Sequence, residues 1–75
     1  MTRTGELRLE EIAAEIERLD DAREWNLAHF RRLYAAALDA SAGDERQLEF
    51  FGPFIRSESY LKAARELSRK YRPAA

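Results

Sequence analysis

The strongest constraint on the fold is an apolar residue at every third or fourth position through the first half of the chain. The positions are Leu9, Ile12, Ile16 and Leu19, followed by Leu27, Phe30, Tyr34 and Leu38. This spacing places the apolar side chains on one stripe of an α-helix, with charged side chains on the opposite face. It predicts helical structure from about residue 7 to residue 39.

Two interpretations of this first half are open. The stripe keeps its helical phase across a skipped position at Arg23, which favours one continuous helix. Asp20-Asp21 followed by Glu24 is instead typical of a helix N-cap with a carboxylate at the third position, which would split the segment near residue 20. We prefer the continuous helix. Its roughly 32 residues would extend about 48 Å at 1.5 Å per residue, so the rest of the chain would have to pack along it.

Turn and capping residues divide the second half of the chain. Segment 39–44 contains Gly43, which can end a helix, and Asp44, which can cap the next one. A second helix is predicted over about 44–51. Gly52-Pro53 should interrupt it, because proline lacks a backbone donor and disfavours helix in the residue before it.

A third helix is predicted over about 57–71, with Ser57 as its cap and Arg72-Pro73 as its stop. Its apolar stripe consists of Tyr60, Ala64, Leu67 and Tyr71, with Leu61 at the flank. Nothing in the sequence marks a second domain, so residues 1–75 are expected to form one.

The composition supports an all-α fold. The 75 residues include no valine and no cysteine, and Ala, Leu, Glu and Arg are abundant, so helices are favoured and disulfides are excluded. We therefore expect a long-helix hairpin or three-helix unit whose second arm is broken at Gly52-Pro53. Because so short a chain has a small core, we also expect a homodimer that builds a helical bundle.

The net charge of −1 conceals an uneven distribution along the chain. Residues 1–24 carry eight acids and four bases, whereas residues 56–72 carry six bases and two acids. These segments would attract each other if they lay side by side. The pattern is compatible with a hairpin within one chain or with antiparallel pairing between two chains.

Several classes of function have no support in the sequence. We find no phosphate-binding glycine loop and no nucleophile motif, and His29 is the only histidine, so we expect no enzyme activity. The acidic residues follow the polar face of a helix, so neither a metal nor another cofactor is expected. The sequence shows no hydrophobic stretch long enough for a membrane span or a signal peptide, and we expect a cytoplasmic protein without membrane contact.

The favoured functional hypothesis is a small regulatory or adaptor protein that binds another protein. Apolar residues exceed what a two-arm hairpin can cover, and aromatic side chains are typical anchors of interfaces. The candidate protein-binding residues are Trp25, Phe50, Phe51, Phe54 and Ile55. Either a second chain or the third helix folding back could cover this surplus.

Two alternative functions are weighed beside it. The basic row of the third helix could contact nucleic-acid phosphates, although the sequence pI of about 5.8 is low for such a domain. The residues of this row are Lys62, Arg65, Arg69 and Arg72. The chain could also be an accessory subunit of a larger enzyme complex, which the sequence does not separate from an adaptor.

Overall fold

The computed structural model describes residues 8–71, and every regular element in that range is helical. The elements are the α-helices α1 (Leu9–Asp21), α2 (Leu27–Ala40) and α3 (Glu58–Lys70) and the 3₁₀ helix η1 (Glu45–Phe54). The predicted all-α class is confirmed. In the same range, no helix is long and apolar enough to span a bilayer.

The prediction of one continuous helix over about 7–39 is wrong, because α1 ends at Asp21. Arg23 adopts a left-handed conformation with φ of 61°. Its backbone N–H donates to the Asp20 carbonyl, and the N–H of Glu24 donates to the Leu19 carbonyl at 2.9 Å. This pair of bonds is a Schellman motif, which satisfies the last carbonyls of a helix and turns the chain away from its axis.

The second helix then restarts at a cap of its own. Asn26 has an extended backbone, and its side-chain oxygen accepts a hydrogen bond of 3.0 Å from the backbone N–H of His29. Asparagine is among the best N-cap residues for this reason. The alternative split near Asp20-Asp21 was therefore closer to the structure, but the cap is Asn26 and the break lies at residues 22–26.

The break between α1 and α2 also makes the molecule shorter than one continuous helix would be. The longest extent of the molecule is 36 Å, shorter than the roughly 48 Å that an unbroken helix of 32 residues would need. The loop folds α1 back onto α2, so that both halves of the apolar stripe face one core. The first half contributes Ile12, Ile16 and Leu19.

The end of α2 repeats the same motif at the predicted reversal. Ala42 has φ of 55°, and the N–H of Gly43 donates to the Leu38 carbonyl at 2.8 Å. The Asp44 side chain then caps η1 by accepting from the N–H of Arg46 at 3.1 Å, as predicted. Hydrogen bonds from the Gln47 side chain and from this N–H hold the pKa of Asp44 below its ordinary value.

The predicted interruption at Gly52-Pro53 is wrong. The element over 45–54 is a 3₁₀ helix that includes Pro53 and ends at Phe54. A 3₁₀ helix has three residues per turn, so Leu48, Phe51 and Phe54 follow one another along a single edge. Leu48 and Phe51 are buried.

The third helix begins after Ser57, which has the extended backbone of an N-cap but makes no capping hydrogen bond with its side chain. Tyr60 and Ala63 are its buried residues, while Ala64, Leu67 and Tyr71 pack partly buried against the core. The predicted stop at Arg72-Pro73 lies outside the described residues.

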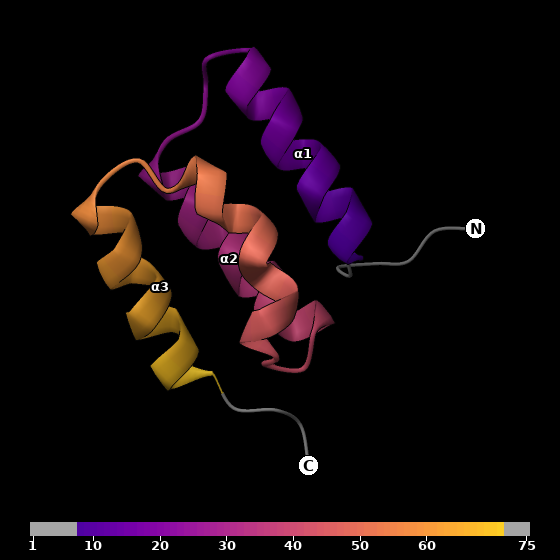
Figure 1. Cartoon of the computed structure of the whole chain (residues 1–75), viewed down its shortest axis with the longest axis vertical. Helices are drawn as coiled ribbons and strands as arrows, with labels where there is room; N and C mark the ends of the chain where they lie inside the picture. Colours follow the sequence, from indigo (N-terminus) through magenta and orange to yellow (C-terminus); the bar gives the residue numbers. More distant parts are fainter. Residues whose placement is uncertain (1–7, 72–75) are drawn as a thin grey trace.

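Helix α2 is the centre of the arrangement, because it packs against α1, η1 and α3. Helices α1 and α3 lie on opposite sides of α2, with η1 across its front (Figure 1). The core is rich in aromatic contacts, among them Phe30 with Tyr60 at 5.1 Å and Tyr34 with Phe51 at 5.0 Å between ring centroids. The sequence predicted that either a second chain or the third helix covers the surplus apolar surface. In the structure, α3 of the same chain packs against α2. Dimerisation stays a prediction.

Candidate protein-binding surface

Trp25 lies in the loop between α1 and α2 and ties that loop to the end of η1. Its indole N–H donates a hydrogen bond of 2.7 Å to the Phe54 carbonyl oxygen. Its ring meets Phe30 and Phe54 edge to face at 6.1 Å between centroids, and it stacks with Tyr60 at 6.3 Å. Such aromatic pairs add to the stability given by burial alone. Trp25 therefore joins three segments of the chain and is only partly exposed.

The other aromatic residues of the predicted protein-binding site do not form one exposed patch. Phe51 is 1% exposed and belongs to the core, so a partner cannot reach its side chain in this conformation. Phe50, Phe54 and Ile55 are partly buried and pack against that core. With Trp25, they offer a partner only the edges of side chains that already have contacts within the chain.

A small pocket of about 470 Å³ opens beside Trp25. Its lining consists of Asp20, Asp21, Arg23, Trp25 and Arg56. The Arg56 guanidinium contacts the Asp20 carboxylate at 2.6 Å and lies 5.9 Å from the centroid of the Phe54 ring. Two acids and two arginines balance in this lining, so the pocket favours neither anions nor cations.

A second pocket of about 470 Å³ lies over α2, between α3 and the start of η1, and we call it the α3 groove. Its lining consists of Tyr34, Glu45, Leu61, Ala64, Arg65, Ser68 and Arg69. These residues come from three elements: Tyr34 belongs to α2, Glu45 to η1, and the remaining five to α3. Helices η1 and α3 both pack against α2 (Figure 1). The groove lies where these three elements meet.

The α3 groove has an apolar part and a charged rim. Leu61 is 43% exposed, and among the described residues it is the one large hydrophobic side chain that is exposed. Tyr34 is only 7% exposed and belongs to the core beneath. Arg65 and Arg69 are exposed on the α3 side, and Glu45 is exposed on the η1 side.

The structure brings together only part of the predicted basic row. Arg65 and Arg69 both line the α3 groove, and Lys62 is exposed on the same helix. Arg72 lies outside the described residues. Sequence reasoning did not assign the other lining residues to a binding site; these are Tyr34, Glu45, Leu61, Ala64 and Ser68. Tyr34 and Glu45 belong to other elements than α3, and a groove between elements leaves no periodic pattern in the sequence.

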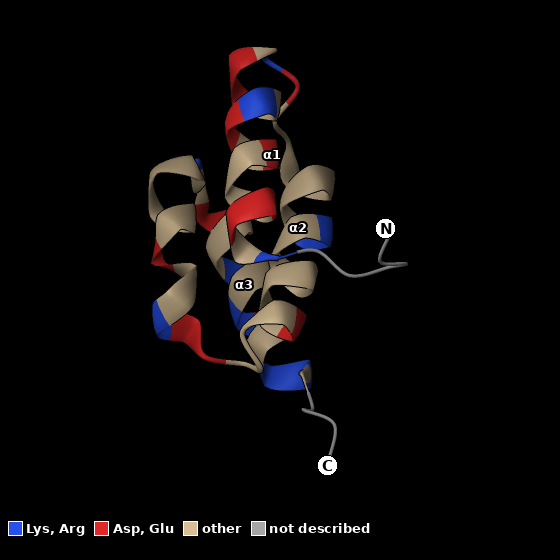
Figure 2. Cartoon of the chain, turned by 90° about the vertical axis from the view of Figure 1, so that its right-hand side faces the viewer, with Lys and Arg blue, Asp and Glu red and all other residues tan. Residues whose placement is uncertain are grey.

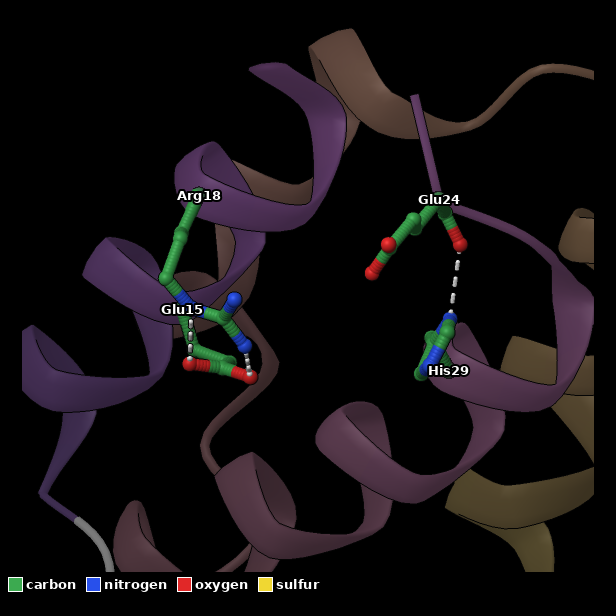
Figure 3. A network of polar contacts seen from close by, with 4 residues as sticks. All are labelled: Glu15, Arg18, Glu24 and His29. Carbon is green, nitrogen blue, oxygen red and sulfur yellow. Dashed lines mark hydrogen bonds and ion pairs between the residues drawn. The ribbon is translucent and has the colours of Figure 1, made fainter. Parts of the chain in front are cut away.

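His29 has a structural partner near the break between α1 and α2. Its Nδ1 atom lies 2.9 Å from the Glu24 carbonyl oxygen, so Nδ1 donates when it carries the proton (Figure 3). On the neighbouring α1, the Arg18 guanidinium binds the Glu15 carboxylate at 2.5 and 3.1 Å. The side-chain hydrogen bond from Arg18 lowers the pKa of Glu15 below its ordinary value. These contacts give His29, Glu15 and Arg18 partners within the chain.

Within residues 8–71, no three His, Asp or Glu side chains gather closely enough to hold a metal ion. No protein-family model, no curated protein and no solved structure matches this sequence.

Proposed function

We propose that this chain is a small regulatory or adaptor protein that binds another protein at the α3 groove. The observation that carries the proposal is the exposure of Leu61 beside a concave surface of about 470 Å³. Single exposed leucines are common on protein surfaces. Leu61 differs from these because it lines a shallow groove, where a partner side chain can contact residues of more than one helix.

The chemistry of the lining favours a protein partner. Leu61 and Ala64 provide apolar contact, and Ser68 can donate or accept a hydrogen bond. The exposed arginines provide the polar rim that surrounds the apolar centre of most interfaces. Apolar contacts beside exposed charges are the combination found in protein–protein interfaces, and this combination supports protein binding.

The predicted binding residues around Trp25 have a supporting part in this proposal. Trp25 and Phe54 hold the loop before α2 against the end of η1 and thereby fix η1 on α2. The position of η1 in turn sets one wall of the groove. We thus assign the direct contacts to the α3 groove and the support of its shape to the aromatic residues. We also propose that the protein is cytoplasmic and that two copies of the chain form a homodimer.

The experiment is partner capture with a matched pair of variants. Leu61→Glu places a charge in the groove, whereas Ala14→Glu places the same charge on the exposed face of α1. Both should keep the helical circular dichroism of the unaltered chain, since surface substitutions usually change stability by less than about 0.5 kcal/mol. We expect to find proteins that the unaltered chain and Ala14→Glu retain but Leu61→Glu does not. Calorimetry with the purified partner should show the same loss of binding for Leu61→Glu. Equal capture by both variants would contradict the proposal.

A further inference from the structure

The chemistry of the α3 groove narrows the class of partner that fits it. Two guanidinium groups, from Arg65 and Arg69, stand on one rim against the single carboxylate of Glu45 on the other. The lining between them is apolar at Leu61 and Ala64. A complementary ligand therefore carries negative charge on one side and an apolar side chain directed into the groove.

The arrangement of the α3 residues also defines the shape of that ligand. Leu61, Arg65 and Arg69 follow one another at intervals of four residues, so they lie along one side of α3. The span from Leu61 to Arg69 is about 12 Å at 1.5 Å per residue, or roughly two helical turns. A groove of this length beside a helix suits a second helix, whose side chains three and four residues apart meet the groove in register.

The charge of the surrounding surface acts in the same direction. Helix α3 carries four cationic and two acidic residues, whereas α1 carries six acidic residues and one arginine. Helix α1 lies beyond α2 on the other side of the molecule (Figure 1). Acidic residues recur along α1, and basic residues mark the end of α3 from which the C-terminal trace leaves (Figure 2). An acidic partner is thus attracted to the α3 side and repelled from the α1 side.

These features disfavour nucleic acid at the same groove. Phosphate binding requires a surface dominated by cations, and Glu45 would stand against the phosphates on the η1 rim. The whole chain has a net charge of −1 and a sequence pI of about 5.8. An exposed leucine also gives little to a phosphate backbone, while it contributes directly to the burial of an apolar side chain.

We propose that the ligand of the α3 groove is an acidic amphipathic helix of two to three turns, with leucine-like side chains that enter beside Leu61. This inference rests on the proposed protein-binding function and adds the chemistry of the partner to it. Carboxylates of the bound helix pair with Arg65 and Arg69, and its apolar edge covers Leu61 and Ala64.

The test uses three fluorescent probes and the full chain. The first probe is a synthetic amphipathic peptide of about three turns with a leucine edge and glutamates beside it. The second has lysine at every glutamate position, and the third is a duplex DNA oligonucleotide. Fluorescence anisotropy at low salt should show binding of the acidic peptide at least about tenfold tighter than binding of the lysine peptide, and the preference should weaken as salt is added.

Charge reversal in the protein provides the reciprocal measurement. The double variant Arg65→Glu/Arg69→Glu should lose about tenfold or more in affinity for the acidic peptide and gain affinity for the lysine peptide. Equal binding of the two peptides to the unaltered chain, or tighter binding of the DNA, would overturn the inference. If Leu61→Glu still abolishes capture of a natural partner while the acidic peptide fails, the proposed function stands and the acidic-helix inference falls.

Discussion

The replacement of Trp25 by alanine tests whether its aromatic contacts hold the fold together. Removal of a buried tryptophan side chain typically costs about 3–5 kcal/mol, and partial exposure places Trp25 near the lower value. Loss of the indole hydrogen bond to the Phe54 carbonyl is included in that cost and is worth about 1 kcal/mol. A domain of this size has about 4–11 kcal/mol of stability in total. Trp25→Ala should therefore remove a large part of the free energy of unfolding.

The assay is urea denaturation followed by far-ultraviolet circular dichroism, because the variant lacks the tryptophan that fluorescence would report. Trp25→Phe separates the two contributions: the ring contacts are largely kept, the N–H donor is lost, and a cost of about 1–2 kcal/mol is expected. Leu61→Ala is the control on an exposed side chain and should cost less than about 1 kcal/mol. A Trp25→Ala protein within about 0.5 kcal/mol of the unaltered chain would refute the packing described for this residue.

Further predictions concern the turns and the surface charges. Ala42→Gly should stabilise the chain by up to about 1 kcal/mol, because glycine adopts the left-handed conformation of this position without strain. Ala35→Gly, on the exposed side of α2, should instead destabilise the chain by about 1 kcal/mol. Thermal unfolding of the two variants checks that the stability changes have opposite signs. The pKa of Asp44 is lowered in the folded chain, so its stabilising contribution is complete above the ordinary carboxyl pKa and is lost as pH falls through the lowered one. Asp44→Asn keeps a capping oxygen but does not titrate, so its urea midpoint should depend less on pH in the acidic range, and an unchanged dependence would contradict this assignment. Arg56→Ala should cost less than about 1 kcal/mol in urea titrations and less still at high salt, because its ion pair with Asp20 is solvent-exposed; a salt-independent loss above that value would contradict it.

The sequence predicted the helix class and several element ends, but the preferred interpretation missed the break between α1 and α2, to which the alternative split near residue 20 came closer. The apolar stripe returns in phase after the break, so periodicity alone could not detect it. The left-handed residue that ends α1 is Arg23, whereas this position is usually glycine, so the usual signal was missing. Asn26 was the available signal, because asparagine before an apolar periodic run is a common N-cap.

The predicted interruption at Gly52-Pro53 was wrong because the type of helix was misjudged. Proline is incompatible with the interior of an α-helix, and the prediction assumed that geometry. A 3₁₀ helix has a different hydrogen-bond register, and Pro53 fits within it. Phe51 is buried because η1 packs against α2, where its ring meets Phe30 and Tyr34, although the sequence grouped it with its neighbours as an interface residue.

The candidate site could be predicted only in part. Arg65 and Arg69 were recognised as a charged row, and Leu61 was recognised at the flank of the α3 stripe. Their combination with Tyr34 and Glu45 depends on how three elements pack, and residues so far apart in the sequence share no pattern. The recurrence of Leu61, Arg65 and Arg69 at every fourth position was the part of this site that the sequence contained.

Site-specific photo-cross-linking tests most directly whether the α3 groove binds a protein. A photoreactive amino acid is placed either at Ser68 in the groove or at the exposed Ala14 of α1, and each protein is irradiated with its cellular partners present. We predict a cross-linked partner from position 68 that is lost in the Leu61→Glu background, and no such product from position 14. Cross-linking of the same partner from position 14, with none from position 68, would contradict the account.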